Sequence, residues 1–318
     1  MWDWLPLAAA GTELSDTERY LFDTAGYLVI PDALPSELIA QCLRASERIH
    51  DDPAVVEAQL RAQQGEQPDG EHGPGWRQLG NAYAHDRRFE PLIDHDSVLP
   101  KVHGLLGGKF IMGGSWCTRV PPGFAAGGLH PDGPYHDSLD VSAPPLLALR
   151  VGFVLTPLTT PDSGELWVVP GGPSSRELFF LPHPSAWCLL VTKDYLLAGS
   201  HRSLQPIPPG TTVSELPLAR PLQLPSGTAI LFHQSLVHCG GANKQPHHRY
   251  MFHAVFTPPW MARTDGRATS YADPHTRLEC SLHVAFLTAF ARPQGAAGEI
   301  DGAAASVDGR VHHDDRAL

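Results

Sequence analysis

The sequence predicts a mainly β protein, a sandwich or jelly-roll barrel with α-helices before it. The chain has 318 residues, and its 30 Gly and 31 Pro favour short strands joined by turns over long helices. After residue 110, strand-like runs are separated by turn residues, and no alternation of strands with helices is visible. A parallel sheet covered by helices is therefore not expected.

The N-terminal part carries the signals of a helix followed by a strand. Ser15 is the expected N-cap and Glu18 its capping-box partner, so a helix should cover Asp16–Thr24. Gly26 suits the position after the last helical turn. Tyr27–Ile30 is a run of β-forming residues closed by a proline, which predicts a strand.

Two more helical segments are expected before residue 110. Ser36 should cap a helix whose apolar residues, at helical spacing, run to Ile49. The apolar pattern fades over residues 51–75, and Gln63–Gly70 within this stretch predicts a loop or a flexible insertion. Helical periodicity returns over Phe89–Leu106 and ends at Gly107.

The β-rich part is expected to form a barrel core over residues 109–260. The predicted strands are Phe110–Val120, Leu146–Leu155, Glu165–Val169, Trp187–Lys193, Thr228–Phe232 and Tyr250–Phe256. A proline-rich stretch at about residues 182–225 should form a lid-like insertion. We expect one domain over residues 1–291, with its helical and strand-containing N-terminal part at 14–108, and a disordered tail at 292–318.

Composition argues against several classes of protein. The net charge of −11 disfavours a nucleic-acid binder, and five cysteines without a C-x-x-C pair favour a reducing compartment. The N-terminus lacks the basic start of a signal peptide, and the apolar stretch Leu146–Leu158 is too short to span a bilayer. We therefore expect a soluble, cytoplasmic protein with a small-molecule substrate and no nucleic-acid or membrane partner. The oligomeric state stays open.

The most informative motif is His130-Pro131-Asp132, followed 108 residues later by His238. Two imidazoles and one carboxylate in this order are the ligand set of the facial triad that holds non-haem Fe(II) and leaves positions open for oxygen chemistry. In a strand, residues two apart share a face and can share a metal ion. Arg249 suggests a fork for the carboxylate of a co-substrate, and the alternative is a surface ion pair at a strand end.

Histidine-x-acid triplets are common in a chain with 18 His and 34 acidic residues, where about two arise by chance. His50 begins one such triplet, but it ends a helix, in which residues two apart point in different directions. His312 and His313 begin others in a polar tail, where a solvated segment is the simpler interpretation. Only His130 and Asp132 lie in a β-rich context.

Further candidates follow from alternation along the strands. His253 shares a face with Arg249 and could line the co-substrate site or be a satisfied core histidine. Arg119 and Cys117 share one face of the preceding long strand, and Trp116 lies on the other.

Three more side chains are candidates for substrate contact. Arg150 is a charge inside an apolar strand, so it should face a polar cavity or pair with an acid. Tyr135 and His136 directly follow the metal-binding motif. Trp116 completes this predicted substrate set.

Four blocks in this order resemble the phytanoyl-CoA dioxygenase family of Fe(II)/2-oxoglutarate oxygenases, over most of residues 15–260. The blocks are Phe22–Pro31, Leu129–Asp132, Thr159–Pro173 and the stretch from Gly227 to Arg249. In the third block, Gly172-Pro173 stands where the family usually has a small residue and a histidine. The resemblance implies a double-stranded β-helix, that is, a cupin-like jelly roll with flanking helices.

The resemblance also implies the chemistry of the site. Fe(II) would bind His130, Asp132 and His238, 2-oxoglutarate would chelate the iron and place its far carboxylate on Arg249, and O2 would take the remaining position. Succinate and CO2 would be released while a small organic molecule is hydroxylated or otherwise oxidised. Asp132 favours hydroxylation, because related halogenases leave its position vacant for chloride. The remaining candidates for the co-substrate site are Arg119, Cys117, Gly240 and His253.

Two other functions remain open on the same scaffold. A cupin-like isomerase or lyase could use the same three ligands and would not need Arg249. A non-catalytic protein could bind a small molecule there, because a fold does not fix a function.

Overall fold

The structure is a computed structural model and describes residues 5–62, 75–107, 109–130, 132, 145–171, 213–215 and 218–259. Among these residues, no helix is both long and apolar enough to cross a membrane. The predicted strand Trp187–Lys193 and the predicted tail at 292–318 lie outside the described part, as does most of the lid-like insertion.

Helices and strands alternate in the N-terminal part, and strands dominate after it. The helices are α1 (Asp16–Ala25), α2 (Ser36–Asp51), α3 (Pro53–Ala62), α4 (Ala82–His85) and α5 (Leu99–Leu106), with 3-10 turns η2 (Arg87–Leu92) and η4 (Val213–Glu215). The strands are β1 (Tyr27–Ile30), β2 (Arg77–Gly80), β3 (Ile111–Val120), β4 (Leu149–Val154), β5 (Leu166–Val169), β6 (Arg220–Leu222), β7 (Ala229–His233), β8 (Val237–Gly240) and β9 (Arg249–Thr257).

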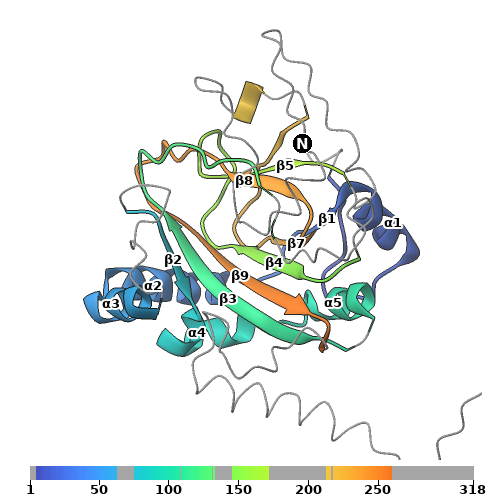
Figure 1. The fold of residues 1–318 in the computed structure, drawn as a ribbon, viewed down its shortest axis with the longest axis horizontal. Coiled ribbons are helices and arrows are strands. Elements are labelled where there is room, and N and C mark those ends of the chain that lie inside the picture. Colours follow the sequence, from blue (N-terminus) through green and yellow to red (C-terminus); the bar gives the residue numbers. More distant parts are fainter. Residues whose placement is uncertain are drawn as a thin grey trace, which may run out of the picture.

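Two antiparallel sheets form a jelly-roll core. The large sheet has the order β1-β7-β4-β9-β3-β2 and the small sheet the order β6-β5-β8. Neighbours in the large sheet come from distant parts of the sequence, and β3, β4, β7 and β9 run side by side through its middle (Figure 1). The predicted mainly β jelly-roll fold with flanking helices is confirmed.

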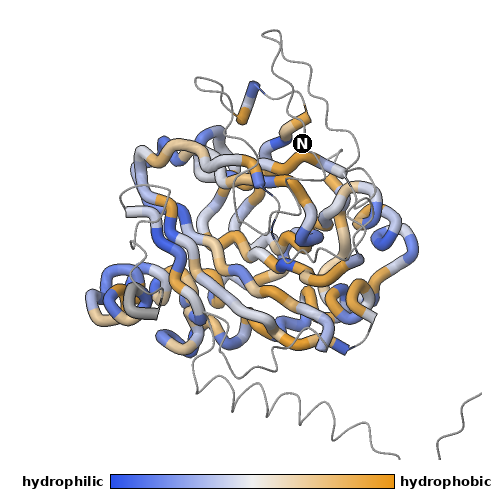
Figure 2. The backbone as a smooth tube through the Cα atoms, viewed as in Figure 1, coloured by the Kyte–Doolittle hydropathy of each residue, from blue (hydrophilic) through white to orange (hydrophobic). Residues whose placement is uncertain are grey.

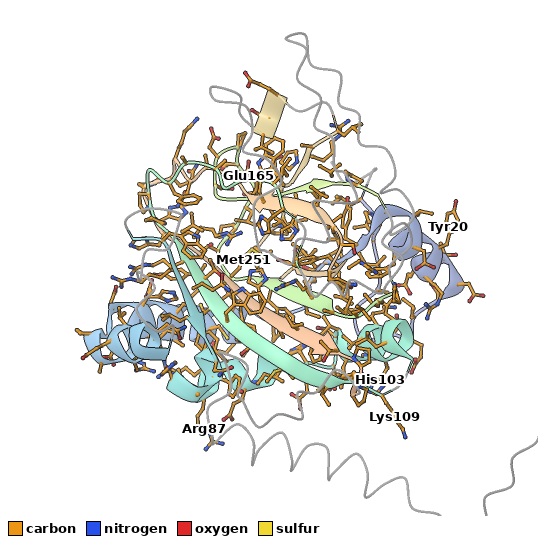
Figure 3. All side chains as sticks on the ribbon, viewed as in Figure 1. Tyr20, Arg87, His103, Lys109, Glu165 and Met251 are labelled. Atoms are coloured by element: carbon orange, nitrogen blue, oxygen red, sulfur yellow. The ribbon has the colours of Figure 1, made fainter. Side chains whose placement is uncertain are left out.

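Both faces of the large sheet are buried, because helices cover one face and the small sheet covers the other. On β9, Tyr250, Phe252, Ala254 and Phe256 pack into the core that the helices share, whereas Met251 packs into the core between the sheets. Hydrophobic colour follows the central strands (Figure 2), and Met251 lies in the middle of the molecule (Figure 3). This alternation is the period of two that a strand imposes on its side chains.

The first helix forms as its capping signals predict. Ser15 Oγ accepts the backbone N–H of Glu18 at 3.2 Å, and Glu18 Oε2 accepts the N–H of Ser15 at 2.8 Å. Gly26 is left-handed, with φ of 82°. The same Glu18 carboxylate also binds the fully buried Lys101 Nζ at 2.8 Å, which ties α1 to α5.

The other helices differ from the predictions in three places. Pro35, not Ser36, is the N-cap of α2, and it forms no side-chain cap. Helix α3, which the fading apolar pattern does not predict, forms within residues 51–75, and the loop predicted at Gln63–Gly70 lies outside the described residues. The helix expected over Phe89–Leu106 is divided into η2 and α5, because Pro91 lies inside η2 and a second proline opens α5. Strands β2, β6 and β8 were not predicted from local pattern.

Candidate metal centre

The two candidate histidines are held side by side by the backbone. His130 forms an isolated antiparallel bridge with His238 of β8. The backbone N–H of each donates to the carbonyl of the other at 2.9 Å, and the ring centroids are 4.6 Å apart. The pair is therefore fixed by the main chain, although its members are far apart in sequence.

Hydrogen bonds to carbonyls set which nitrogen of each ring carries the proton. His130 Nδ1 donates to Gly128 O at 2.8 Å, and His238 Nδ1 donates to Leu236 O at 2.9 Å. Because a carbonyl only accepts, the lone pair of each neutral ring is on Nε2. Burial lowers the pKa of His238 to about 4, although Asp132 raises it in part. Both rings thus have the arrangement of metal-binding histidines, whose second nitrogen is held by an outer hydrogen bond.

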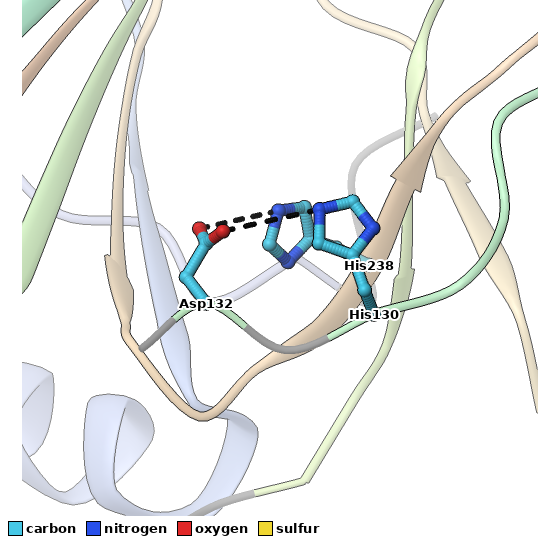
Figure 4. Close-up of side chains that lie close together, drawn as sticks. All are labelled: His130, Asp132 and His238. Carbon is cyan, nitrogen blue, oxygen red and sulfur yellow. Dashed lines mark ion pairs between the residues drawn. The ribbon is translucent and has the colours of Figure 1, made fainter. Parts of the chain in front are cut away.

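Asp132 completes a compact donor set with the two histidines (Figure 4). Its Oδ1 lies 3.8 Å from His130 Nε2, its Oδ2 lies 3.4 Å from His238 Nε2, and the three ligand atoms lie within 4.8 Å of one another. Burial alone would raise the pKa of Asp132, but Arg150 and the two histidines hold it below its usual value. A charged carboxylate and two neutral imidazoles suit a divalent iron ion.

A row of stacked side chains on the large sheet borders this donor set. Arg150 Nε forms an ion pair with Asp132 Oδ2, and its guanidinium lies 4.8 Å from the ring centre of Trp116. The Trp116 ring stacks on His253, with centroids 5.5 Å apart and planes 18° apart. The His253 ring lies against Gly152, where a Cβ atom would be 3.2 Å from its Nδ1. Burial, with Arg249 and Arg150 nearby, lowers the pKa of His253 to about 3.

Arg249 at the start of β9 points to the same side of the sheet as His253, as alternation predicts. Arg249 is 5% exposed, and its Nε has no hydrogen-bond partner. No described acidic side chain forms an ion pair with this arginine. Burial lowers its pKa to about 10, and Glu165 offsets part of that shift. Gly164 packs against it, because a Cβ there would lie 3.2 Å from Arg249 Cγ. A buried cation of this kind fits a carboxylate ligand.

The structure does not bring Arg119 and Cys117 to the metal cluster. Both lie on the face of β3 that packs against the helices, opposite to the face of Trp116. Arg119 pairs with Asp51 at 2.9 Å, and Cys117 Sγ lies 3.3 Å from Ser46 Oγ. The two residues alternate as we expected, but the face they share is the wrong one, and we remove them from the candidate site.

Of the remaining predicted site residues, the structure describes Gly240 but not Tyr135 or His136. Gly240 lies on β8, two residues after the second histidine, and a Cβ there would meet nothing within 4 Å. Tyr135 and His136 lie outside the described residues. Two contributors were missed, Gly152 and Gly164, although an isolated glycine in a strand or turn does signal close approach of another group.

Comparison with known proteins places these observations in a wider group. The family model for phytanoyl-CoA dioxygenase (PhyH) matches residues 22–184, which is more than half of the chain. The match includes the first histidine and the aspartate of the cluster.

Several solved structures share the fold. HygX from Streptomyces hygroscopicus, with nickel, 2-oxoglutarate and hygromycin B bound, is 17% identical with a TM-score of 0.54, over 82% of this chain and 97% of that one. The non-haem α-ketoglutarate-dependent carbocyclase SnoK from nogalamycin biosynthesis is 18% identical with a TM-score of 0.51, over 78% and 86%. The epimerase SnoN, in complex with Fe3+, α-ketoglutarate and nogalamycin RO, is 21% identical with a TM-score of 0.50, over 81% and 89%.

Proposed function

Because the chain belongs to the phytanoyl-CoA dioxygenase family, we propose that it is an Fe(II)- and 2-oxoglutarate-dependent dioxygenase that oxidises a small organic molecule. The observation that carries the proposal is the donor set of His130, Asp132 and His238, whose ligand atoms lie within 4.8 Å of one another. Iron bound there would supply oxygen activation, coupled to the conversion of 2-oxoglutarate to succinate and CO2.

The residues of this chain have separate tasks in the proposed reaction. His130 and His238 present Nε2 to the metal because their Nδ1 atoms are held by carbonyls. Asp132 adds one negative charge. Three protein ligands would hold the metal ion and leave room for a bidentate 2-oxoglutarate and for oxygen.

Arg249 provides the charge that the far carboxylate of 2-oxoglutarate needs. Its guanidinium is buried and has no ion pair among the described residues, so an anionic ligand would satisfy it. This feature favours an oxygenase over a metal-dependent isomerase or lyase, which has no need of a second carboxylate site. His253 and Gly240 stay candidates for contact with the co-substrate.

The outcome of the oxidation is the finer part of the proposal. Asp132 occupies a ligand position and thereby favours hydroxylation over halogenation. The carbocyclase and epimerase among the similar structures use the same fold, so ring closure or epimerisation of the substrate are outcomes to be tested by product analysis. Trp116 and Arg150 border the cluster and are proposed to contact the small-molecule substrate.

The helices share one hydrophobic core with the large sheet, and the large sheet shares another with the small sheet. This continuity supports one oxygenase domain within residues 1–291.

The test is iron-dependent formation of succinate from 2-oxoglutarate. The purified protein is incubated with Fe(II), ascorbate and 2-oxoglutarate, with and without candidate substrates, and succinate is measured by mass spectrometry. We expect slow succinate formation without substrate, and its loss in His130→Ala and His238→Ala. His247→Ala is the matched control, because this exposed histidine lies outside the cluster and should leave the rate unchanged. Absence of succinate and of metal binding in the unaltered protein would refute the proposal.

A further inference from the structure

Asp132 is contacted from two sides that belong to different sheets. The two histidines approach it from the small-sheet side, where His130 pairs with His238 of β8. Arg150 approaches it from β4 of the large sheet. Arg150 forms its ion pair with Oδ2, which also lies 3.4 Å from His238 Nε2, whereas Oδ1 lies 3.8 Å from His130 Nε2. The two carboxylate oxygens therefore have different surroundings.

Arg150 is itself held in place by its neighbours on the large sheet. Its guanidinium lies over the Trp116 ring, and that ring stacks on His253. The His253 ring occupies the space that Gly152 leaves by having no side chain. Cation–aromatic contact and ring stacking leave the guanidinium little freedom to move away from the carboxylate.

Arg150 forms no ion pair with any other acidic side chain in the described part of the chain. Its side chain is only 13% exposed, so separating it from Asp132 would leave a buried charge without compensation. The contact is therefore expected to persist while the carboxylate also binds a metal ion.

We propose that Arg150 is a positioning residue that occupies one oxygen of Asp132, so that this carboxylate offers the metal ion a single oxygen. A carboxylate can bind a metal through one oxygen or through both, and the second mode would use one more coordination position. One-oxygen binding keeps three positions free for 2-oxoglutarate and oxygen. The inference rests on the proposed function, because it assigns a role within the same metal centre.

The first experiment compares Arg150→Gln with the unaltered protein in two readouts that do not depend on turnover. Calorimetry measures the binding of Mn(II), and then the binding of 2-oxoglutarate to the Mn(II)-loaded protein. Crystal structures of the Ni(II)-loaded proteins show how many oxygens of Asp132 bind. We expect one bound oxygen in the unaltered protein and two in the Arg150→Gln variant. The affinity for 2-oxoglutarate should fall about tenfold or more, while Mn(II) binding is retained.

Two further variants keep the test decisive. Arg119→Gln removes a buried, ion-paired arginine on the other face of the large sheet and should change neither readout. Trp116→Leu leaves Arg150 in the chain but removes the ring under its guanidinium, and it should give a smaller loss of the same kind. This variant also serves if Arg150→Gln does not fold.

The failure of this inference differs from the failure of the proposed function. If the unaltered protein binds neither Mn(II) nor 2-oxoglutarate, the proposed function is refuted. If it binds both, and Arg150→Gln binds 2-oxoglutarate equally well with one oxygen of Asp132 on the metal, the positioning role is refuted. A loss of 2-oxoglutarate affinity without a second bound oxygen would also refute it, because Arg150 would then act on the co-substrate directly.

Discussion

Replacing Arg249 by methionine should weaken co-substrate binding without weakening the fold. Burial lowers the pKa of Arg249 well below its usual value, to about 10, which corresponds to a cost of about 3 kcal/mol for burying the charged form. The guanidinium is charged at neutral pH in both the folded and the unfolded chain, so this whole cost is present there. Methionine has a similar length and no charge, and we expect the free energy of unfolding to stay equal or to rise by up to about 3 kcal/mol.

The same substitution removes the partner of the 2-oxoglutarate carboxylate. Loss of one member of a buried, hydrogen-bonded charge pair costs about 2–5 kcal/mol, which is a fall in affinity of about 30-fold to several thousand-fold. Urea unfolding measures stability, and calorimetry on the Mn(II)-loaded protein measures 2-oxoglutarate binding. Arg119→Met is the matched control, because Arg119 is equally buried but ion-paired to Asp51. It should lose stability and keep its affinity. The reasoning is refuted if Arg249→Met binds 2-oxoglutarate normally or loses more than about 1 kcal/mol of stability.

Three further outcomes are expected. Gly164→Ala should lower the affinity for 2-oxoglutarate in calorimetry, because its Cβ would push against the side chain of Arg249. Gly123→Ala is the control, since Gly123 has a similar positive φ and a Cβ there would meet nothing within 4 Å, and it should only lose about 1–2 kcal/mol of stability. His50 is fully buried and its pKa is lowered to about 4. Below about pH 6.5 the unfolded chain therefore binds a proton at His50 that the folded chain does not, and the free energy of unfolding falls as the pH drops towards 4. In urea unfolding, His50→Asn should lose about 2 kcal/mol less stability between pH 7 and pH 4.5 than the unaltered protein does. Lys101→Ala should destabilise by about 3 kcal/mol or more in the same assay, because Glu18 would lose its buried partner.

Local sequence signals predicted elements where the cause of the structure is itself local. The capping box of Ser15 and Glu18, the glycine after the first helix and the long strands β3 and β9 all follow from neighbouring residues. The short strands β2, β6 and β8 do not. Strands β1 and β5 are just as short but are runs of apolar, mostly β-forming residues, whereas β2, β6 and β8 each contain a glycine or a proline. Their pairing depends on partners that are distant in the sequence.

The candidate site shows the same division. Alternation correctly separated Trp116 from Arg119 and Cys117, but it could not tell which set faces the metal cluster. The usual clue is that one face of a strand is apolar and buried while the other is polar and exposed. This clue fails on β3, because the helices bury one face and the small sheet the other. A buried arginine then occurs on each face of the sheet, Arg119 on one and Arg249 on the other, and only their partners distinguish them.

The division of the site between two sheets gives the packing between them a functional consequence. The small-sheet side fixes the histidine pair through two backbone hydrogen bonds of 2.9 Å, neither of which involves a residue of the large sheet. Arg150 and Arg249 belong to the large sheet, so their distance from the histidines depends on the core between the sheets, to which Met251 contributes. A change in that core would leave the histidine pair intact and shift both guanidinium groups relative to it. Metal binding and co-substrate binding are therefore expected to respond differently to the same loss of packing. Only co-substrate binding requires the two sheets to keep their relative position.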